Sequence, residues 1–134
     1  MRTFVDSSAL LAVLDGDDQN HSSAAAAWIE LIAAGSELVC TNYILVEAFA
    51  LVQNRLGMDA VRTFHDDLVP LLQIEWIDAE HHARSVAALL IAGRRQLSLV
   101  DCSSFEVMRS SGIDEVFAFD RHFAEQGFNC LPSD

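Results

Sequence analysis

The chain has 134 residues, of which 51% are hydrophobic, so it is long enough for one domain with a substantial core. Its 20 acidic and 8 basic residues give a formal net charge of −12, which argues against nucleic-acid binding through a basic face and is typical of a solvated acidic surface. All the basic residues are arginines. The absence of lysine excludes a Walker A loop and disfavours receiver-type and haloacid-dehalogenase-type sites, which place a lysine beside their carboxylates.

In the first half of the chain, short apolar runs alternate with longer helical patterns. We predict strands at 3–5 and 37–40, and helices at 9–14, 22–34, 42–56 and 58–68. Thr41 should cap the helix at 42–56, which is apolar nearly all round and therefore buried on most faces.

The second half continues the alternation, with strands at 72–77, 115–119 and 128–131 and helices at 79–92, 98–109 and 120–126. Strands that alternate with helices predict an α/β fold with right-handed crossovers and a mostly parallel sheet covered on both faces. Because we find no linker and no internal repeat, we expect a single domain over residues 1–134.

The three cysteines, Cys40, Cys102 and Cys130, are odd in number and lie within apolar runs, so we expect buried thiols in a reducing compartment such as the cytoplasm. The N-terminus lacks the pattern of a signal peptide. The longest apolar run, 43–52, is interrupted by Glu47 and is too short to span a bilayer.

Three aspartates lie where a predicted helix begins. Asp6 follows the first strand, Asp120 follows the strand at 115–119, and Asp101 completes a Ser98-x-x-Asp101 capping pattern. Each of them could serve only as a helix cap, worth about 1 kcal/mol. The residues alone therefore leave cap and catalytic roles open.

Glu47 is the one ionisable residue in the apolar run 43–52. A buried carboxylate needs a partner, there is no lysine, and Arg55 is eight positions away on the same helix and is not expected to reach it. A surface position stays open, and we favour a metal ligand that faces a cleft.

The predicted topology brings these four acids to one edge of the sheet, where the carboxyl ends of parallel strands form ligand sites. Two carboxylates 4 Å apart repel by about 4 kcal/mol at an effective dielectric of about 20, so a cation is needed. Oxygen ligands favour Mg²⁺ or Mn²⁺, and such ions activate water and stabilise a leaving oxygen in phosphodiester cleavage. With no well-placed histidine expected, proton removal is left to the metal or to one of the acids.

Four segments resemble the motifs of the PIN-domain ribonucleases, and in particular the VapC-like toxins of bacterial and archaeal toxin–antitoxin pairs. The segments are Phe4-Val5-Asp6-Ser7-Ser8-Ala9-Leu10, Thr41-Asn42-Tyr43-Ile44-Leu45-Val46-Glu47, Leu97-Ser98-Leu99-Val100-Asp101 and Phe119-Asp120-Arg121-His122-Phe123. The resemblance covers residues 3–131.

The resemblance implies a compact α/β/α sandwich and Mg²⁺- or Mn²⁺-dependent cleavage of single-stranded or looped RNA. It implies that Asp6, Glu47, Asp101 and Asp120 are the metal-binding and catalytic acids, and that Ser7 or Ser8 supports Asp6 by hydrogen bonding. It also implies a homodimer and a small antitoxin whose basic tail occupies the acidic groove.

The chain departs from the family pattern at Ala118, because a serine or threonine often stands two positions before the last aspartate. Candidates for RNA contact are Arg94, Arg95 and Arg121, with His122 beside the last of them, and each is equally compatible with a solvated charge. Two other functions stay open. One is a non-catalytic module of this fold that binds a basic peptide in its acidic groove, and the other is a DNA-directed nuclease or another phosphohydrolase with the same metals.

Overall fold

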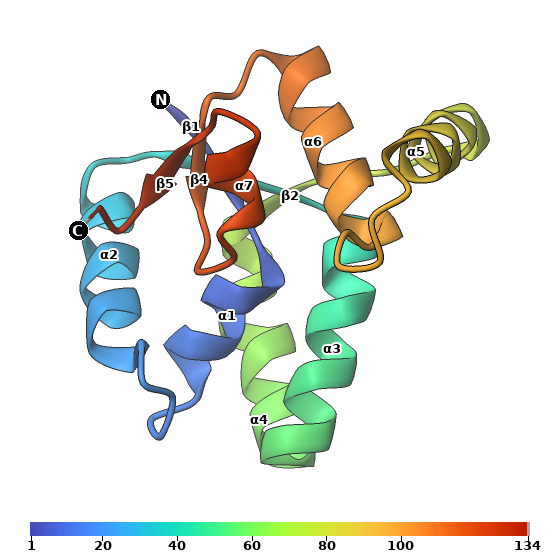
Figure 1. The fold of residues 1–134 in the computed structure, drawn as a ribbon. Helices are drawn as coiled ribbons and strands as arrows, with labels where there is room; N and C mark the ends of the chain where they lie inside the picture. The colour runs from blue at the N-terminus through green and yellow to red at the C-terminus, as the bar shows by residue number, and fades with distance from the viewer. Residues whose placement is uncertain (134) are drawn as a thin grey trace.

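Five parallel strands form the centre of the computed structural model, which describes residues 1–133 (Figure 1). The strands are β1 (Arg2–Val5), β2 (Glu37–Thr41), β3 (Leu72–Glu75), β4 (Glu115–Phe117) and β5 (Asn129–Leu131). They lie in the order β3-β2-β1-β4-β5, and every neighbouring pair is parallel. The predicted α/β class is confirmed, and the sheet is wholly parallel within these residues.

Helices pack on both faces of this sheet. They are α1 (Ser7–Leu14), α2 (His21–Ala33), α3 (Asn42–Leu56), α4 (Met58–Thr63), α5 (Ala79–Ala92), α6 (Leu99–Ser111) and α7 (His122–Glu125). On one face the ring of Trp28 of α2 lies 6.4 Å from that of Phe117 of β4. On the other, Phe123 of α7 lies 6.4 Å from Phe4 of β1. Phe4 pairs with Val116, the neighbour of Phe117, so the two strand phenylalanines point to opposite faces, and the three-layer prediction is confirmed.

The central strands are buried on both sides, which explains why they read as continuous apolar runs rather than alternating ones. Phe4 and Val5 of β1, Val39 of β2, and Val116 and Phe117 of β4 are fully buried. This core fixes the ends of β1 and β4, and thereby the residues that follow them.

Several helices begin at side-chain caps, of which Thr41 and the Ser98–Asp101 pair were predicted from the sequence. The Thr41 side chain accepts a hydrogen bond from the backbone N–H of Ile44, and the Asp78 side chain accepts one from His81. Ser98 and Asp101 form a complete capping box at the start of α6.

Several predicted elements end earlier in the structure, among them the strand expected over 72–77, which ends at Glu75. The helix expected over 58–68 is α-helical only to Thr63 and continues as a π-helical turn, Phe64–Leu68, and a 3₁₀ turn, Val69–Leu71. Phe64 and Leu68 of the π-helical turn are both buried in the core, and Pro70 lacks the N–H that a longer helix needs. The strand expected over 115–119 ends at Phe117, because the N–H of Phe119 donates to Ser8 Oγ instead of to a strand.

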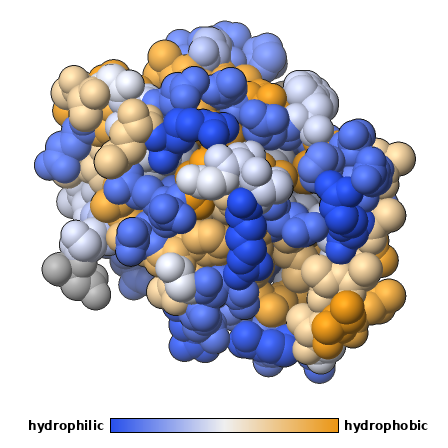
Figure 2. Space-filling view, turned by 90° about the horizontal axis from the view of Figure 1, so that it is seen from above, coloured by the Kyte–Doolittle hydropathy of each residue, from blue (hydrophilic) through white to orange (hydrophobic). Residues whose placement is uncertain are grey.

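The surface combines polar residues with several exposed apolar side chains. Hydrophilic residues cover most of the face shown in Figure 2, and apolar residues form smaller patches on it. Large apolar side chains with more than two thirds of their surface exposed include Val46, Trp76, Leu90 and Ile91. Among residues 1–133, no helix is both long enough and apolar enough to cross a membrane.

Candidate active site

The candidate site lies where the chain connections diverge from the middle of the sheet. β1 and β4 are neighbours, but the chain runs from β1 towards β2 and from β4 towards β5, on opposite sides. Such a switch point leaves a crevice at the carboxyl ends of the two strands. Asp6 follows β1 directly and Asp120 lies three residues beyond β4, so both reach this crevice.

All four acids predicted from the sequence line one cleft of about 320 Å³ at this edge: Asp6, Glu47, Asp101 and Asp120. Glu47 comes from α3, and Asp101 comes from the first turn of α6. Glu47 therefore faces the cleft, and the surface position that the sequence left open is not the one observed.

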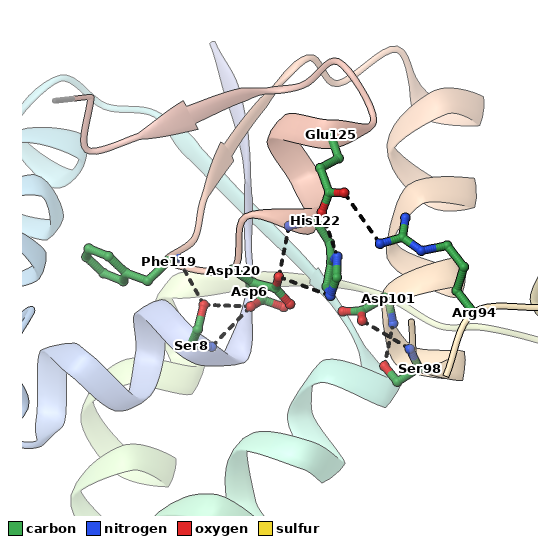
Figure 3. A network of polar contacts seen from close by, with 9 residues as sticks. All are labelled: Asp6, Ser8, Arg94, Ser98, Asp101, Phe119, Asp120, His122 and Glu125. Carbon is green, nitrogen blue, oxygen red and sulfur yellow. Dashed lines mark hydrogen bonds and ion pairs between the residues drawn. The ribbon is translucent and has the colours of Figure 1, made fainter. Parts of the chain in front are cut away.

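Hydrogen bonds hold each acid in place. Ser8 donates to Asp6 Oδ2 from its hydroxyl at 2.6 Å and from its backbone N–H at 3.2 Å, and the same hydroxyl accepts the N–H of Phe119 at 3.0 Å (Figure 3). The backbone N–H of Ser98 donates to Asp101 Oδ2 at 3.1 Å. Ser7 Oγ donates to Glu47 Oε1.

Only one oxygen of each carboxylate is used in this way. Asp6 and Asp101 accept through Oδ2, Asp120 accepts the backbone N–H of His122 through Oδ1, and Glu47 accepts through Oε1. Within residues 1–133 the second oxygen of each of the four accepts no hydrogen bond from protein. Capping and ligand binding are therefore compatible roles for the same side chain, one oxygen serving each.

Burial and mutual repulsion make the cleft electrostatically unfavourable without a cation. Burial raises the pKa of Asp6 to about 7, the Ser8 hydrogen bonds oppose this rise, and the nearby charges of Glu47 and Asp101 add to it. Burial also raises the pKa of Asp101; the Ser98 backbone hydrogen bond opposes that rise and the charge of Asp120 reinforces it. No arginine within residues 1–133 forms an ion pair with any of the four acids.

The donor set fits a divalent ion. Ligand atoms of Asp101, Asp120 and His122 lie within 4.8 Å of one another, and Asp6 and Glu47 line the same cleft as Asp101 and Asp120. Hard carboxylate oxygens are the ligands that Mg²⁺ and Mn²⁺ accept.

His122 was not expected in this position, and the expectation of no well-placed histidine is wrong. Its side chain is 13% exposed, its Nε2 lies 3.9 Å from Asp120 Oδ1, and its Nδ1 lies 2.9 Å from Glu125 Oε1 (Figure 3). The sequence shows that His122 follows Asp120 by two positions. It does not show that α7 turns the ring towards Asp101.

Arg55 is a second residue that sequence reasoning missed. It is exposed and lines the same cleft as Glu47, with Leu51 between them at a spacing of four residues on each side. Residues i, i+4 and i+8 share one helix face, so this pattern was available in the sequence. Asp18 and Asn20, from the loop between α1 and α2, also line the cleft.

The arginines predicted to contact RNA lie elsewhere. Arg94 is exposed and pairs with Glu125 at 3.4 Å, while Arg95 and Arg121 are exposed. None of the three lines the cleft that contains the four acids, although Arg121 lines a shallower hollow that also includes Asp120. Their contact with RNA stays a prediction.

The profile of the PIN domain matches residues 3–129. This chain belongs to the PIN-domain family. The predicted membership and the predicted α/β/α sandwich are thereby confirmed.

Among the PIN-domain proteins, VapC20 from two strains of Mycobacterium tuberculosis, described as a 23S rRNA-specific endonuclease, is 32% identical over 127 residues, which are 93% of this chain and 94% of VapC20. The crystal structure of VapC20, described as a sarcin–ricin loop cleaving toxin, superposes with a TM-score of 0.82 at 29% identity and covers 94% of this chain and 95% of that one. FitAcB from Neisseria gonorrhoeae shares the fold, with a TM-score of 0.67 at 15% identity over 97% of this chain and 96% of the other.

Proposed function

We propose that this protein is an endoribonuclease that cleaves single-stranded or looped RNA with the help of Mg²⁺ or Mn²⁺, and that it is the toxin of a type II toxin–antitoxin pair. One observation carries the proposal: four acids distant in sequence line one cleft, and within residues 1–133 each has one oxygen that accepts a hydrogen bond from protein and one that does not. The likeness to VapC20 supports RNA as the substrate class and a looped ribosomal segment as the first substrate to test.

The acids have distinguishable tasks in this proposal. Asp6, Asp101 and Asp120 hold the ion, and Glu47, fixed by Ser7, completes the cleft from α3. A divalent ion bound there supplies Lewis-acid activation of water and neutralises charge at the scissile phosphate. The hydroxyl of Ser8 donates to Asp6 and so orients it. The same hydroxyl accepts the backbone N–H of Phe119, which directly precedes Asp120.

Ser8 supplies a hydroxyl beside the position where the family often has a serine or threonine and this chain has Ala118. Ala118 is buried and offers no side-chain donor, and its backbone N–H donates to Leu131 O at 3.1 Å. The hydroxyl of Ser8 donates a hydrogen bond to Asp6 and accepts one from the backbone N–H of Phe119, the residue after Ala118. We therefore expect Ala118 to be compatible with activity.

The negative net charge of the protein affects which molecules it can bind. At −12, and with Arg55 as the basic residue of the cleft, the protein should repel RNA unless divalent ions are present. The same charge suits an antitoxin with a basic tail that enters the cleft. The exposed apolar side chains of α3 and α5, among them Val46 and Leu90, are suited to a homodimer or antitoxin contact.

The test is cleavage of a fluorescent RNA stem–loop by purified protein in Mn²⁺, in Mg²⁺ and in excess chelator. We expect cleavage only with a divalent ion and only in the unpaired segment, and we expect none with Asp6→Asn. Asp17→Asn is the matched control and should cleave normally, because Asp17 is exposed and its side chain makes no hydrogen bond to residues 1–133. Equal cleavage by Asp6→Asn, or in chelator, would contradict the proposal.

Two further substrates separate the alternatives. A DNA stem–loop of the same sequence distinguishes a ribonuclease from a DNA-directed nuclease. An arginine-rich peptide that binds tightly, without any divalent-ion binding or cleavage, would instead identify a non-catalytic binding module.

A further inference from the structure

The ring of His122 is held between a carboxylate on its own helix and the acids of the cleft. Its Nδ1 lies 2.9 Å from Glu125 Oε1, one helical turn further along α7. The other oxygen of Glu125 lies 3.4 Å from the guanidinium of Arg94, which fixes the glutamate in turn (Figure 3). The ring therefore has a defined orientation before any ligand arrives.

This hydrogen bond determines which nitrogen carries the proton. A carboxylate accepts only, so Nδ1 must be the donor, and in the neutral imidazole the lone pair is then on Nε2. Nε2 points to the acids, at 3.9 Å from Asp120 Oδ1, and the side chain is 13% exposed. A metal cation between this lone pair and the carboxylates would satisfy both.

The distances leave room for that cation. At 3.9 Å, Nε2 and Asp120 Oδ1 are too far apart for a hydrogen bond, and Oδ1 instead accepts the backbone N–H of His122, so Nε2 has no hydrogen-bond partner within residues 1–133. One ligand atom from each of Asp101, Asp120 and His122 lies within 4.8 Å of the others, a spacing at which the three could hold a single ion.

We propose that His122 is a nitrogen ligand of the divalent ion held by Asp101 and Asp120, that Glu125 and Arg94 orient it, and that it makes the site prefer Mn²⁺ to Mg²⁺. The inference rests on the proposed function and adds a ligand and a metal preference to it. A histidine that donates its second N–H to a carboxylate is the usual arrangement at protein metal sites. Imidazole nitrogen favours first-row transition ions over Mg²⁺, which prefers oxygen.

The direct test is pulsed electron paramagnetic resonance of Mn²⁺ bound to the full chain without RNA. We expect modulation from one ¹⁴N nucleus in the wild-type protein, and its replacement by a ¹⁵N signal when histidine is labelled. His122→Gln should abolish the modulation, and His65→Gln, an exposed histidine outside the cleft, should retain it. The labelling arm needs no substitution, so it stands even if His122→Gln folds poorly.

Calorimetric titration gives the second readout. His122→Gln should weaken Mn²⁺ binding by at least about tenfold and change Mg²⁺ binding by less than about threefold, while His65→Gln leaves both unchanged. If the wild-type protein binds Mn²⁺ and cleaves RNA but shows no nitrogen modulation, the assignment of His122 is overturned and the proposed function stands. If the wild-type protein binds no divalent ion, both are overturned.

Discussion

Asp6→Asn should abolish cleavage and at the same time stabilise the metal-free protein at neutral and alkaline pH. Asp6 is 4% exposed, and its burial raises the pKa from 3.8 to about 7. The difference corresponds to about 4 kcal/mol at about 1.4 kcal/mol per pH unit. Asparagine is neutral, and its Oδ1 can still accept the hydrogen bonds from Ser8, so the variant lacks the cost of burying a charge.

The sign of the pH dependence follows from proton binding. Between pH 3.8 and about 7 the folded state holds a proton on Asp6 that the unfolded state has lost, so wild-type stability falls as pH rises through this window. Above about pH 7 both states are ionised and the full cost remains. The stability gain of Asp6→Asn over wild type should therefore grow from near zero at pH 4 to at most about 4 kcal/mol at pH 8.

The assay is urea unfolding in chelator at pH 4.5, 6 and 8, followed by circular dichroism. Asp17→Asn removes one negative charge from an exposed position and controls for the change in net charge. Its stability difference should stay near zero at every pH. A gain for Asp6→Asn that is the same at pH 4.5 and pH 8 would refute the argument, because only ionisation of Asp6 makes the gain depend on pH.

Two further substitutions examine the residues around the acids. Arg55→Gln should raise the KM for RNA about five- to tenfold with little change in kcat, because we expect Arg55 to contact one RNA phosphate. Loss of that contact should also make a plot of log binding constant against log salt concentration less steep by about 0.7. Arg62→Gln, which removes an exposed arginine paired only with Asp59, is its control, and equal effects of the two changes would count against a specific contact. Ser8→Ala should reduce the free energy of unfolding by about 1–3 kcal/mol and lower kcat, because Asp6 loses the hydroxyl donor and keeps only the backbone N–H, and the N–H of Phe119 loses its acceptor. Ser22→Ala on the exposed face of α2 should change neither, and unaltered kcat in Ser8→Ala would show that this hydroxyl does not position Asp6.

Local signals in the chain were sufficient to find the elements and the acids. Helix caps such as Thr41 and Asp78, the apolar strand runs, and the single charge of Glu47 within an apolar helix all act over a few residues, so a short window of sequence contains them. The same windows show that Asp6, Asp101 and Asp120 stand at element boundaries, which is why the four acids could be named before their contacts were known.

Contacts between distant segments were decided by the tertiary structure alone. The strand order, the meeting of Ser8 with Phe119 across 111 positions, and the turn of the His122 ring towards Asp101 depend on how β1, β4, α6 and α7 pack. The strand Glu115–Phe117 is shorter than predicted because the hydroxyl of Ser8, from the start of α1, accepts the backbone N–H of Phe119. Such outcomes depend on long-range packing and on side-chain rotamers, which residue type and spacing do not specify.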